Sequence, residues 1–274
     1  MDFSAKLSAA WAKNDSLLCV GLDPDLDKLP KHLASSTDSL FVFNRAIIDA
    51  TTDLVCAYKP NSAFYESLGA DGVNQLKKTC DYIRENHPHI PILLDAKRGD
   101  IGNTNEHYAQ FAFDYLGVDA ITIAPYMGQE ANAAFLARAD KGIIVLCRTS
   151  NPGAGEFQDL EVDGKKLYQL VAERVSTDWN EHNNCLLVVG ATSPTELADV
   201  RTLVGDDITF LVPGVGAQGG DVEATVKAGI NQQGTGVIIN SSRGIIFASD
   251  GKDFAEAARK EAESLRDEIN KYRN

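Results

Sequence analysis

Eight short apolar segments, spread along the whole chain, are the feature that most constrains how this sequence can fold. Each is nearly continuous and rich in Val, Ile and Leu, which is typical of parallel strands buried on both faces. Segments with apolar residues at helical spacing lie between them. The eight segments are 16–23, 54–61, 91–98, 120–126, 142–150, 185–192, 209–215 and 236–243. This alternation predicts an α/β fold, a closed (β/α)8 TIM barrel, with a doubly wound open sheet as the alternative.

The domain organisation follows from length and from the absence of linkers. The chain has 274 residues, and α/β barrels of about 250 residues fold as one unit. No Pro/Gly/Ser-rich linker interrupts the sequence, so residues 1–274 are expected to form one barrel domain. Helical spacing predicts helices over 39–53, 72–86 and 130–141. The polar stretch 151–167 predicts an extended loop, and 251–272 predicts a solvated closing helix.

Composition excludes several classes of protein. The formal net charge is −13 and no Lys/Arg-rich run is present, which argues against nucleic-acid binding. No apolar run approaches the roughly 18 residues of a membrane helix, and the N-terminus lacks a signal-peptide pattern. The five cysteines form an odd, scattered set without a C-x-x-C pair, which favours a reducing compartment. We therefore expect a cytoplasmic protein that binds neither nucleic acid nor membranes.

Charged residues gather at the end of the third apolar segment, in PILLDAKRGDIGNT (91–104). Asp95 and Lys97 are two residues apart, so a strand would point both side chains to one face. Lys59 ends the preceding segment and is expected to reach Asp95, whereas Asp100 follows in a Gly-flanked loop. Because buried charges persist only when paired, Lys–Asp–Lys–Asp forms a coherent network. A stabilising ion-pair cluster and a catalytic site both explain it, and the catalytic interpretation is favoured.

Polar residues also end the other predicted strands, and all strand ends of a barrel meet at one mouth. The seventh segment runs into PGVGAQGGD (213–221), which contains G-x-G-x-x-G. A dinucleotide fold would place an acid roughly twenty residues further on, where none stands. Backbone N–H groups of such a loop suit a phosphate instead, and Arg243 ends the eighth segment. A flexible surface loop is the alternative. The candidate site residues at these ends are Asp23, Lys59, Asn61, Asp95, Lys97, Tyr126, Ser150, Pro213, Gln218, Ser242 and Arg243.

A resident metal is not expected. None of the five histidines has metal-ligand spacing or ends a predicted strand. Spacing alone leaves open a metal site built from Asp23, Asp95 and Asp100. Lys59 and Lys97 argue against it because they compete for the same carboxylates.

Several motifs together resemble the orotidine 5′-phosphate decarboxylase family, in its longer, bacterial-type subgroup. They are CVGLDPD, YKPNSAFYE, LDAKRGDIGNT, ITIAPYMG, VPGVGAQGG and INSSRGI, in this order between about residues 17 and 248. The resemblance implies a homodimeric enzyme that converts orotidine monophosphate to UMP, without a cofactor, in the last step of de novo UMP synthesis. Two features depart from many relatives: Ser242 replaces a glycine, and the loop after the fifth strand is longer.

The resemblance also implies roles for particular residues. Lys97 would protonate C6 of the pyrimidine as CO2 leaves, with Asp95 beside the substrate carboxylate. Lys59 and Asp23 would contact the ribose, and Ser150 the pyrimidine. Asp100 and Thr104 would contact the ribose bound by the other subunit. Gln218 and Arg243 would bind the phosphate, and Pro213 and Ser242 would line the site.

Two rival functions stay open at this point. A metal-dependent barrel acting on a sugar phosphate shares the pattern D-x-K-x-x-D. It would want a carboxylate rather than Lys59 at the end of the second strand. A non-catalytic phosphate-ligand sensor would be expected to have lost Lys97 or Asp95, and both are present.

Overall fold

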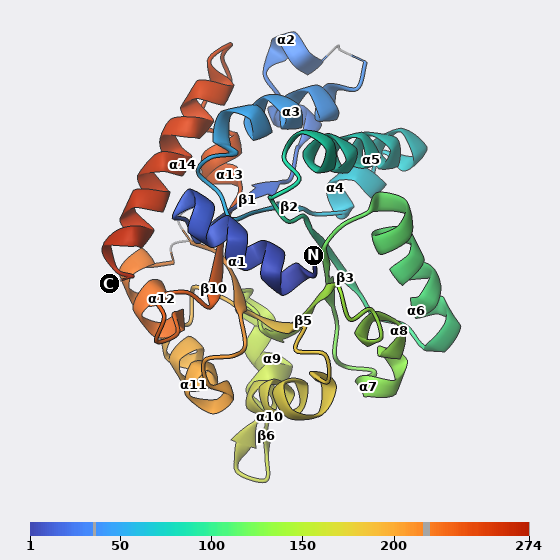
Figure 1. The fold of residues 1–274 in the computed structure, drawn as a ribbon, viewed down its shortest axis with the longest axis vertical. Coiled ribbons are helices and arrows are strands. Elements are labelled where there is room, and N and C mark those ends of the chain that lie inside the picture. The colour runs from blue at the N-terminus through green and yellow to red at the C-terminus, as the bar shows by residue number, and fades with distance from the viewer. Residues whose placement is uncertain (35–36, 216–219, 274) are drawn as a thin grey trace.

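Eight parallel strands form the centre of the molecule, one within each predicted apolar segment (Figure 1). The computed structural model describes residues 1–34, 37–215 and 220–273. The strands are β1 (Leu18–Leu22), β2 (Ala57–Pro60), β3 (Leu93–Arg98), β4 (Ala120–Ile123), β5 (Gly142–Arg148), β8 (Cys185–Val189), β9 (Phe210–Pro213) and β10 (Val237–Ser241). The sequence-based prediction of eight parallel strands is therefore confirmed.

The strands follow the order β2-β1-β10-β9-β8-β5-β4-β3, which leaves β2 and β3 at the two ends of the sheet. Parallel bridges between Tyr58 and Ile92 and between Asn61 and Asp95 join these ends. Across the same seam, the Ser62 N–H donates to the Asp95 carbonyl at 3.2 Å. The sheet thus closes into a TIM barrel, and the open-sheet alternative is wrong.

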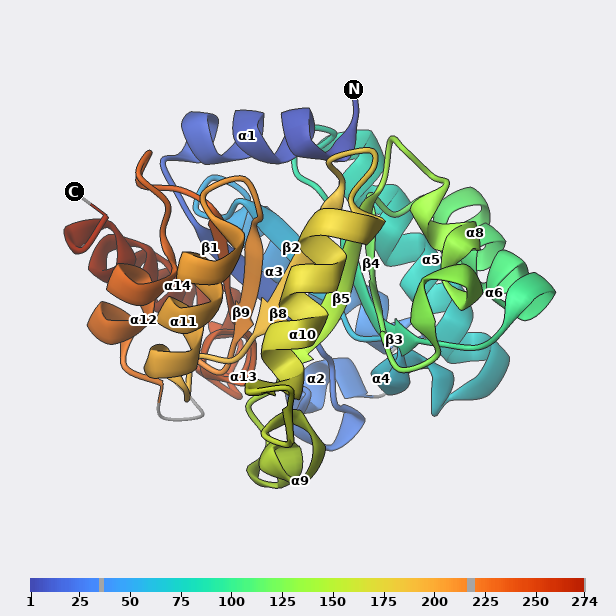
Figure 2. The same ribbon diagram turned by 90° about the horizontal axis from the view of Figure 1, so that it is seen from below.

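Helices surround the barrel and connect successive strands (Figures 1 and 2). The longer ones are α3 (Ser39–Thr51), α5 (Gly69–Asn86), α6 (Gly102–Ala109), α10 (Leu167–Arg174), α11 (Pro194–Val204), α12 (Val222–Gly229) and α14 (Phe254–Lys271). Short helical turns are η1 (Leu26–Lys28), α2 (Lys31–Ala34), α4 (Ala63–Glu66), α7 (Gly128–Ala131), α8 (Ala133–Leu136), η3 (Pro152–Ala154), α9 (Gly155–Gln158) and α13 (Arg243–Ile246). Two π-helical stretches, η2 (Gln110–Leu116) and η4 (Val175–Trp179), continue α6 and α10.

Three sequence-based expectations need correction. The helix expected over 130–141 is two short helices, because the buried Asn132 side chain donates to the carbonyls of Ala124 and Gly128 and interrupts the run. The loop 151–167 contains η3, α9 and a hairpin of β6 (Glu161–Val162) and β7 (Lys165–Lys166). The closing helix α14 is not merely solvated: Phe254, Ala258, Ala262 and Ile269 are buried on one face.

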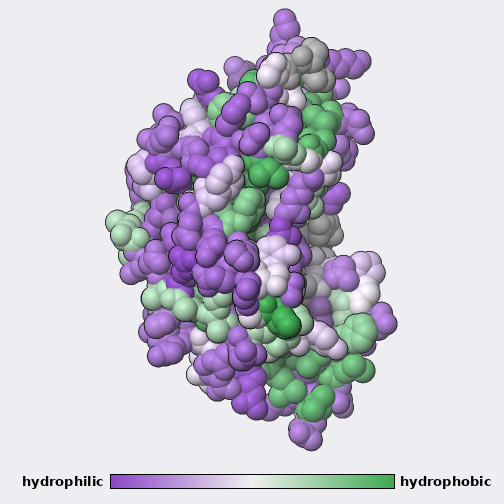
Figure 3. Space-filling model, turned by 90° about the vertical axis from the view of Figure 1, so that its right-hand side faces the viewer, coloured by the Kyte–Doolittle hydropathy of each residue, from purple (hydrophilic) through white to green (hydrophobic). Residues whose placement is uncertain are grey.

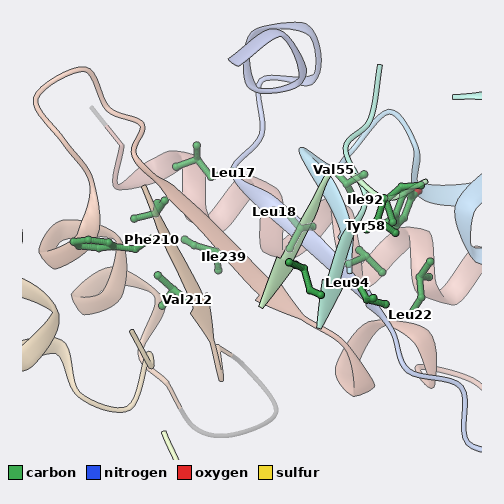
Figure 4. Close-up of a cluster of buried hydrophobic side chains, with 14 of the residues drawn as sticks. Leu17, Leu18, Leu22, Val55, Tyr58, Ile92, Leu94, Phe210, Val212 and Ile239 are labelled. Atoms are coloured by element: carbon green, nitrogen blue, oxygen red, sulfur yellow. The ribbon is translucent and has the colours of Figure 1, made fainter. Parts of the chain in front are cut away.

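Alternate residues of each strand point outward and inward, as the two-residue period of a strand requires. The outward side chains form the core between barrel and helices. Figure 4 shows part of it, including Leu18, Tyr58, Leu94, Val212 and Ile239. The inward side chains form a separate apolar cluster that fills the barrel. Its members on the strands are Cys19, Ala57, Leu93, Ala120, Ile144, Leu186, Val188, Leu211 and Ile238.

The N-terminal segment forms a helix, α1 (Phe3–Asn14), that lies across the amino-terminal end of the barrel (Figure 2). Phe3 and Leu7 of α1 pack against the inward apolar cluster. Lys6 holds the helix in place through an ion pair with Asp119, at 2.9 Å. One end of the barrel is therefore closed by apolar packing, and the other end is left for polar groups.

The outer surface is mainly hydrophilic on the side that α5, α6, α7 and α8 cover (Figure 3). Hydrophobic side chains gather toward the lower edge of that view, the end of the molecule where α9 and α10 lie in Figure 1. Among the residues that the structure describes, no helix is both long and apolar enough to cross a membrane.

Candidate active site

A cavity of about 560 Å³ opens at the carboxyl ends of the barrel strands. This is the end of a TIM barrel where active sites are found. Nine of the residues expected from the sequence line it: Asp23, Lys59, Asn61, Asp95, Lys97, Ser150, Pro213, Ser242 and Arg243. Tyr126, also expected there, does not line it and is 94% exposed. The fold therefore brings together side chains from β1, β2, β3, β5, β9 and β10 or from the loops that follow them.

The Asp95 carboxylate lies at the centre of the charged part of the cavity. Its Oδ1 accepts hydrogen bonds from Lys97 Nζ at 2.6 Å and from the Thr122 hydroxyl at 3.0 Å. Its Oδ2 accepts from Lys59 Nζ at 3.1 Å and from Asn61 Nδ2 at 3.2 Å. Each carboxylate oxygen thus has one cationic and one neutral donor.

The two lysines differ in exposure. The Lys59 side chain is 4% exposed and the Asp95 side chain 12%, whereas that of Lys97 is 50% exposed. Lys59 and Asp95 therefore form a buried ion pair, which is costly to desolvate unless its hydrogen bonds are complete. Lys97 reaches the same carboxylate from the open side of the cavity, where a substrate can approach it.

The pair fixes the charge of both buried groups. Burial by itself raises the pKa of Asp95, but the charges of Lys59 and Lys97 outweigh it and hold this pKa well below its usual range. Burial likewise lowers the pKa of Lys59, and the carboxylates of Asp23 and Asp95 outweigh that effect and raise it. Asp95 is thus an anion and Lys59 a cation at neutral pH.

Lys97 does not sit on a regular strand, contrary to the sequence-based expectation. The register between β3 and β4 shifts between Leu94 and Arg98, and Lys97 has a φ of 47°. A non-glycine residue in this left-handed region is strained. Asp95 and Lys97 still contact each other, but a bulge rather than simple strand alternation directs the lysine toward the carboxylate.

Asp23 borders the same part of the cavity. It follows β1, and its Oδ1 accepts the backbone N–H of Asn61 at 3.2 Å. It also adds negative charge near Lys59. The cation of Lys59 therefore faces two carboxylates, and Asn61 links them, since its backbone bonds Asp23 and its side chain bonds Asp95.

The opposite side of the cavity is formed by the ends of β9 and β10. Pro213, Ser242 and Arg243 line it, and Arg243 is solvent-exposed. Ser242, the departure from glycine, donates to the Gly21 carbonyl at 3.3 Å. A Cβ on Gly21 would lie 2.6 Å from the Ser242 Cβ, so β1 requires glycine at this position because serine follows β10. Gln218 lies outside the described residues.

Ser150, at the end of β5, lines the cavity in a similarly close packing. A Cβ on Gly190 would lie 2.7 Å from the Ser150 Cβ. The segment 151–167 folds beside it and is tied to β5 by Gln158, whose Oε1 accepts the Thr149 N–H at 2.9 Å, and by the ion pair of Arg148 with Asp159. Gln158 and Asn151 also line the cavity.

Asp100 and Thr104 do not line this cavity. Asp100 is held in the loop between β3 and α6, where its Oδ1 accepts the Ile101 N–H at 2.7 Å and its backbone bonds Asn105. Thr104, in α6, is exposed. Within a single chain, the fourth charged residue of the pattern is therefore separate from the Lys59–Asp95–Lys97 network.

Asp23, Asp95 and Asp100, the metal ligands that spacing alone left open, do not come together in one site. In residues 1–34, 37–215 and 220–273, no group of three or more His, Cys, Asp or Glu is arranged to hold a metal ion. Asp100 is outside the cavity, and both oxygens of Asp95 already accept from lysines. The donor set of Asp23, Asp95 and Asp100 therefore does not fit a metal ion.

Thr122 is a site residue that the sequence analysis missed. It lies in β4, is 1% exposed and points into the cavity beside Asp95. Its signal was available, because it is the one polar residue in the strand Ala120–Ile123. A lone threonine in an apolar run fits a strand so well that composition gave no reason to single it out.

Fold and cavity together define a TIM-barrel enzyme whose mouth carries a buried Lys–Asp ion pair, a second, half-exposed lysine on the same carboxylate, and an exposed arginine. The family model described as "Orotidine 5'-phosphate decarboxylase / HUMPS family" matches residues 16–258. The chain belongs to this family.

Relatives over the full length agree. Proteins from Ralstonia pickettii and Cupriavidus necator, both named orotidine 5′-phosphate decarboxylase, are 55% and 56% identical over 274 residues, which cover all of each chain. The solved structure of Leishmania donovani OMP decarboxylase superposes with a TM-score of 0.87 at 39% identity, covering 100% of this chain and 99% of that one.

Proposed function

We infer that this chain decarboxylates orotidine 5′-monophosphate (OMP) to UMP and CO2, the reaction that completes UMP synthesis. The observation that carries this conclusion is the Lys59–Asp95–Lys97 network, found in the barrel mouth of a chain that matches the decarboxylase family over residues 16–258. The metal-dependent sugar-phosphate reaction is not favoured, because Lys59 occupies the place where a carboxylate ligand would be needed.

The chemical difficulty lies at C6 of the pyrimidine. When the bond between C6 and the carboxylate breaks, CO2 leaves and the electron pair remains on C6. A cation held close to C6 stabilises that charge, and a proton from the same group then neutralises it. Lys97 suits both tasks, since its ammonium is exposed to the cavity and held at 2.6 Å from Asp95. Water returns the proton to Lys97 after the step.

Asp95 and Lys59 act on the geometry of this step. Asp95 anchors the ammonium of Lys97 and, as an anion, lies near the position that the substrate carboxylate takes. Because Lys59 and Asn61 occupy its second oxygen, Asp95 cannot turn away from the cavity. Lys59 and Asp23 are placed to hydrogen-bond the ribose, and Ser150 the pyrimidine.

Phosphate binding is assigned to the opposite side of the mouth. Arg243 presents a guanidinium there, which suits phosphate oxygens, and Pro213 and Ser242 border the same space. We include Gln218 in this group on the sequence pattern alone. The phosphate does not react, but the free energy of binding it can lower the activation barrier at C6 if it stabilises the arrangement of the site in the transition state.

We further propose that two chains form a homodimer with shared active sites. Asp100 and Thr104 do not line the cavity of their own chain, and they lie in the loop after β3 and in the first turn of α6. Around them the loops after β3 and β4 are joined by the Ala124 N–H donating to the Arg98 carbonyl at 2.8 Å. These loops expose Ile101 (60%) and Tyr126 (94%), an apolar rim that is typical of an interface.

Residues 1–274 are proposed to act as one catalytic domain in the cytoplasm. All five cysteines are free and buried, in keeping with a reducing compartment. The substrate, rather than nucleic acid or a membrane, is the expected partner, and no cofactor enters the proposed reaction.

An ultraviolet assay with OMP tests the function. Purified protein should consume OMP equally with and without EDTA, and Lys97→Ala should abolish turnover. Turnover that EDTA stops, or none at all, would refute the proposal.

Mixing two inactive variants tests the shared site. Lys97→Ala and Asp100→Ala chains, combined after dissociation, should regain part of the activity, because one mixed site per dimer has both residues intact. If mixed dimers form but stay inactive, Asp100 acts in the active site of its own chain and the shared-site proposal is refuted.

A further inference from the structure

The bulge in β3 has an unusual support on β4. Three residues of β3, Asp95 to Lys97, stand opposite Thr122 where the register between the two strands shifts. Backbone N–H groups at such a bulge lose their partners in the sheet. Here the Thr122 hydroxyl replaces those partners: its Oγ1 accepts the N–H of Ala96 at 3.0 Å and the N–H of Lys97 at 2.9 Å.

The same hydroxyl also bonds the reacting network. A threonine hydroxyl has one proton to donate and two lone pairs to accept with. Since both lone pairs face the two N–H groups, its proton is directed to Asp95 Oδ1, 3.0 Å away. Thr122 is 1% exposed, so its hydroxyl is buried while the three bonds it makes are partly buried. The Thr122 hydroxyl therefore uses its one donor and both acceptor positions on three successive residues of β3, Asp95, Ala96 and Lys97.

These contacts act on the two groups that flank the reacting centre. The Lys97 backbone has a φ of 47°, a strained conformation that persists only when its surroundings enforce it. Without the bond to its N–H, the chain is free to relax toward a regular strand and to withdraw the ammonium. Without the bond to Oδ1, the carboxylate keeps Lys97 as the only donor on that oxygen.

We propose that Thr122 is a positioning residue for the decarboxylation. It holds the strained bulge of β3, and this places the Lys97 ammonium and the Asp95 carboxylate correctly relative to the reacting C6. The proposal rests on the OMP decarboxylase function given above. Thr122 acts through Asp95 and Lys97 and not by binding the distant phosphate, so it should affect the chemical step more than substrate affinity.

Two substitutions at this position separate the hydroxyl from the shape of the side chain. Thr122→Val keeps the branched volume and removes the hydroxyl, whereas Thr122→Ser keeps the hydroxyl. Thr79→Val is the matched control: Thr79 is buried in α5 and does not line the cavity. Its hydroxyl donates to the Gln75 carbonyl of the same helix and accepts from Asn44 Nδ2 at 3.4 Å.

Kinetics with OMP give the first readout. Thr122→Val should lower kcat by about ten- to a hundredfold, the range expected for losing a hydrogen bond to a charged group, with KM changed less than threefold. Thr122→Ser should restore most of kcat, and Thr79→Val should leave it unchanged. A kcat within threefold of wild type in Thr122→Val, or an effect confined to KM, would overturn the proposal while leaving the decarboxylase function intact.

Hydrogen exchange of the backbone gives a second readout that needs no substrate. The amides of Ala96 and Lys97 should exchange at least tenfold faster in Thr122→Val than in wild type, and no faster in Thr79→Val. Unchanged exchange rates at both amides would refute the proposal that Thr122 stabilises the bulge. Failure of the wild-type protein to turn over OMP would instead refute the proposed function, and the exchange result would still decide whether Thr122 maintains the bulge.

Discussion

The two ends of the barrel interior are built from the same strands yet have opposite chemistry. Near the amino ends, the inward side chains are Cys19, Ala57, Leu93, Ala120, Ile144, Leu186, Leu211 and Ile238, all in one buried apolar cluster. Two residues further along each strand stand Gly21, Lys59, Asp95, Thr122, Leu146, Val188, Pro213 and Asn240, and all of these but Gly21 line the cavity. One step of the strand period therefore separates an entirely apolar layer from one that carries the polar side chains of Lys59, Asp95, Thr122 and Asn240.

The difference shows how a stable scaffold and a reactive site share one barrel. At the amino end, α1 covers the apolar cluster with Phe3 and Leu7, and the ion pair of Lys6 with Asp119 lies at its margin. At the carboxyl end, the buried ion pair of Lys59 with Asp95 lies inside the barrel. Disrupting the first end should cost stability alone, whereas disrupting the second should cost activity as well.

The largest effect is expected from Lys59→Met, which breaks the buried pair. Removing one partner leaves Asp95 with Lys97 as its only cation, so we expect the free energy of unfolding to fall by about 3 kcal/mol. We expect kcat for OMP to fall by about a hundredfold or more, because Asp95 loses its fixed orientation. Urea unfolding and steady-state kinetics measure the two effects.

Lys6→Met is the matched control at the other end of the barrel. Lys6 bonds Asp119 at 2.9 Å and is more exposed than Lys59, so its loss should cost about 1 kcal/mol and leave kcat unchanged. A comparable loss of kcat in both lysine variants would contradict the division between the two ends.

Leu7→Ala is expected to affect stability about as much as Lys59→Met, but to leave activity unchanged. Leu7 is 2% exposed and fills the amino end of the barrel, so the cavity left behind should lower the free energy of unfolding by about 2–4 kcal/mol. Below the unfolding temperature, kcat and KM should stay within twofold of wild type. A selective loss of kcat in this variant would show that α1 acts on the catalytic end.

The smallest effect concerns pH. The folded-state pKa of Asp95 is depressed, so its stabilising contribution is present above the unfolded value of about 3.9 and is lost as pH falls through the folded value. The pKa of Lys59 is raised, so its contribution is present below about 10.4 and is lost as pH rises through the folded value. The difference in unfolding free energy between wild type and Lys59→Met should therefore be the same at pH 5 and pH 9. Urea titrations at both values measure it, and a change of more than about 1 kcal/mol would contradict the assigned charges.

Much of the fold could be predicted because it rests on short-range patterns. Eight nearly continuous apolar runs indicate eight buried strands, and the two-residue period of a strand indicates which residues share a face. The convergence of Lys59, Asp95 and Lys97 followed from their positions at strand ends. The helix over 130–141 was mispredicted because Asn132 fits helical spacing while its side chain bonds the backbone.

Other parts depend on contacts between residues far apart in the chain. Thr122 meets the backbone of Lys97 across 25 positions of sequence, and no local pattern marks a threonine for that task. The cover that α1 places over the amino end depends likewise on Lys6 meeting Asp119, 113 residues away.

The sequence by itself therefore determined the barrel, the family and the charged residues of the mouth, because strand period, burial and motif order are properties of neighbouring residues. Only the tertiary structure decided that a bulge held by Thr122 aims Lys97, that α1 closes the far end and that Asp100 stands outside its own cavity. Each of these depends on the register between elements, and register is set by packing across the whole barrel rather than by any one segment.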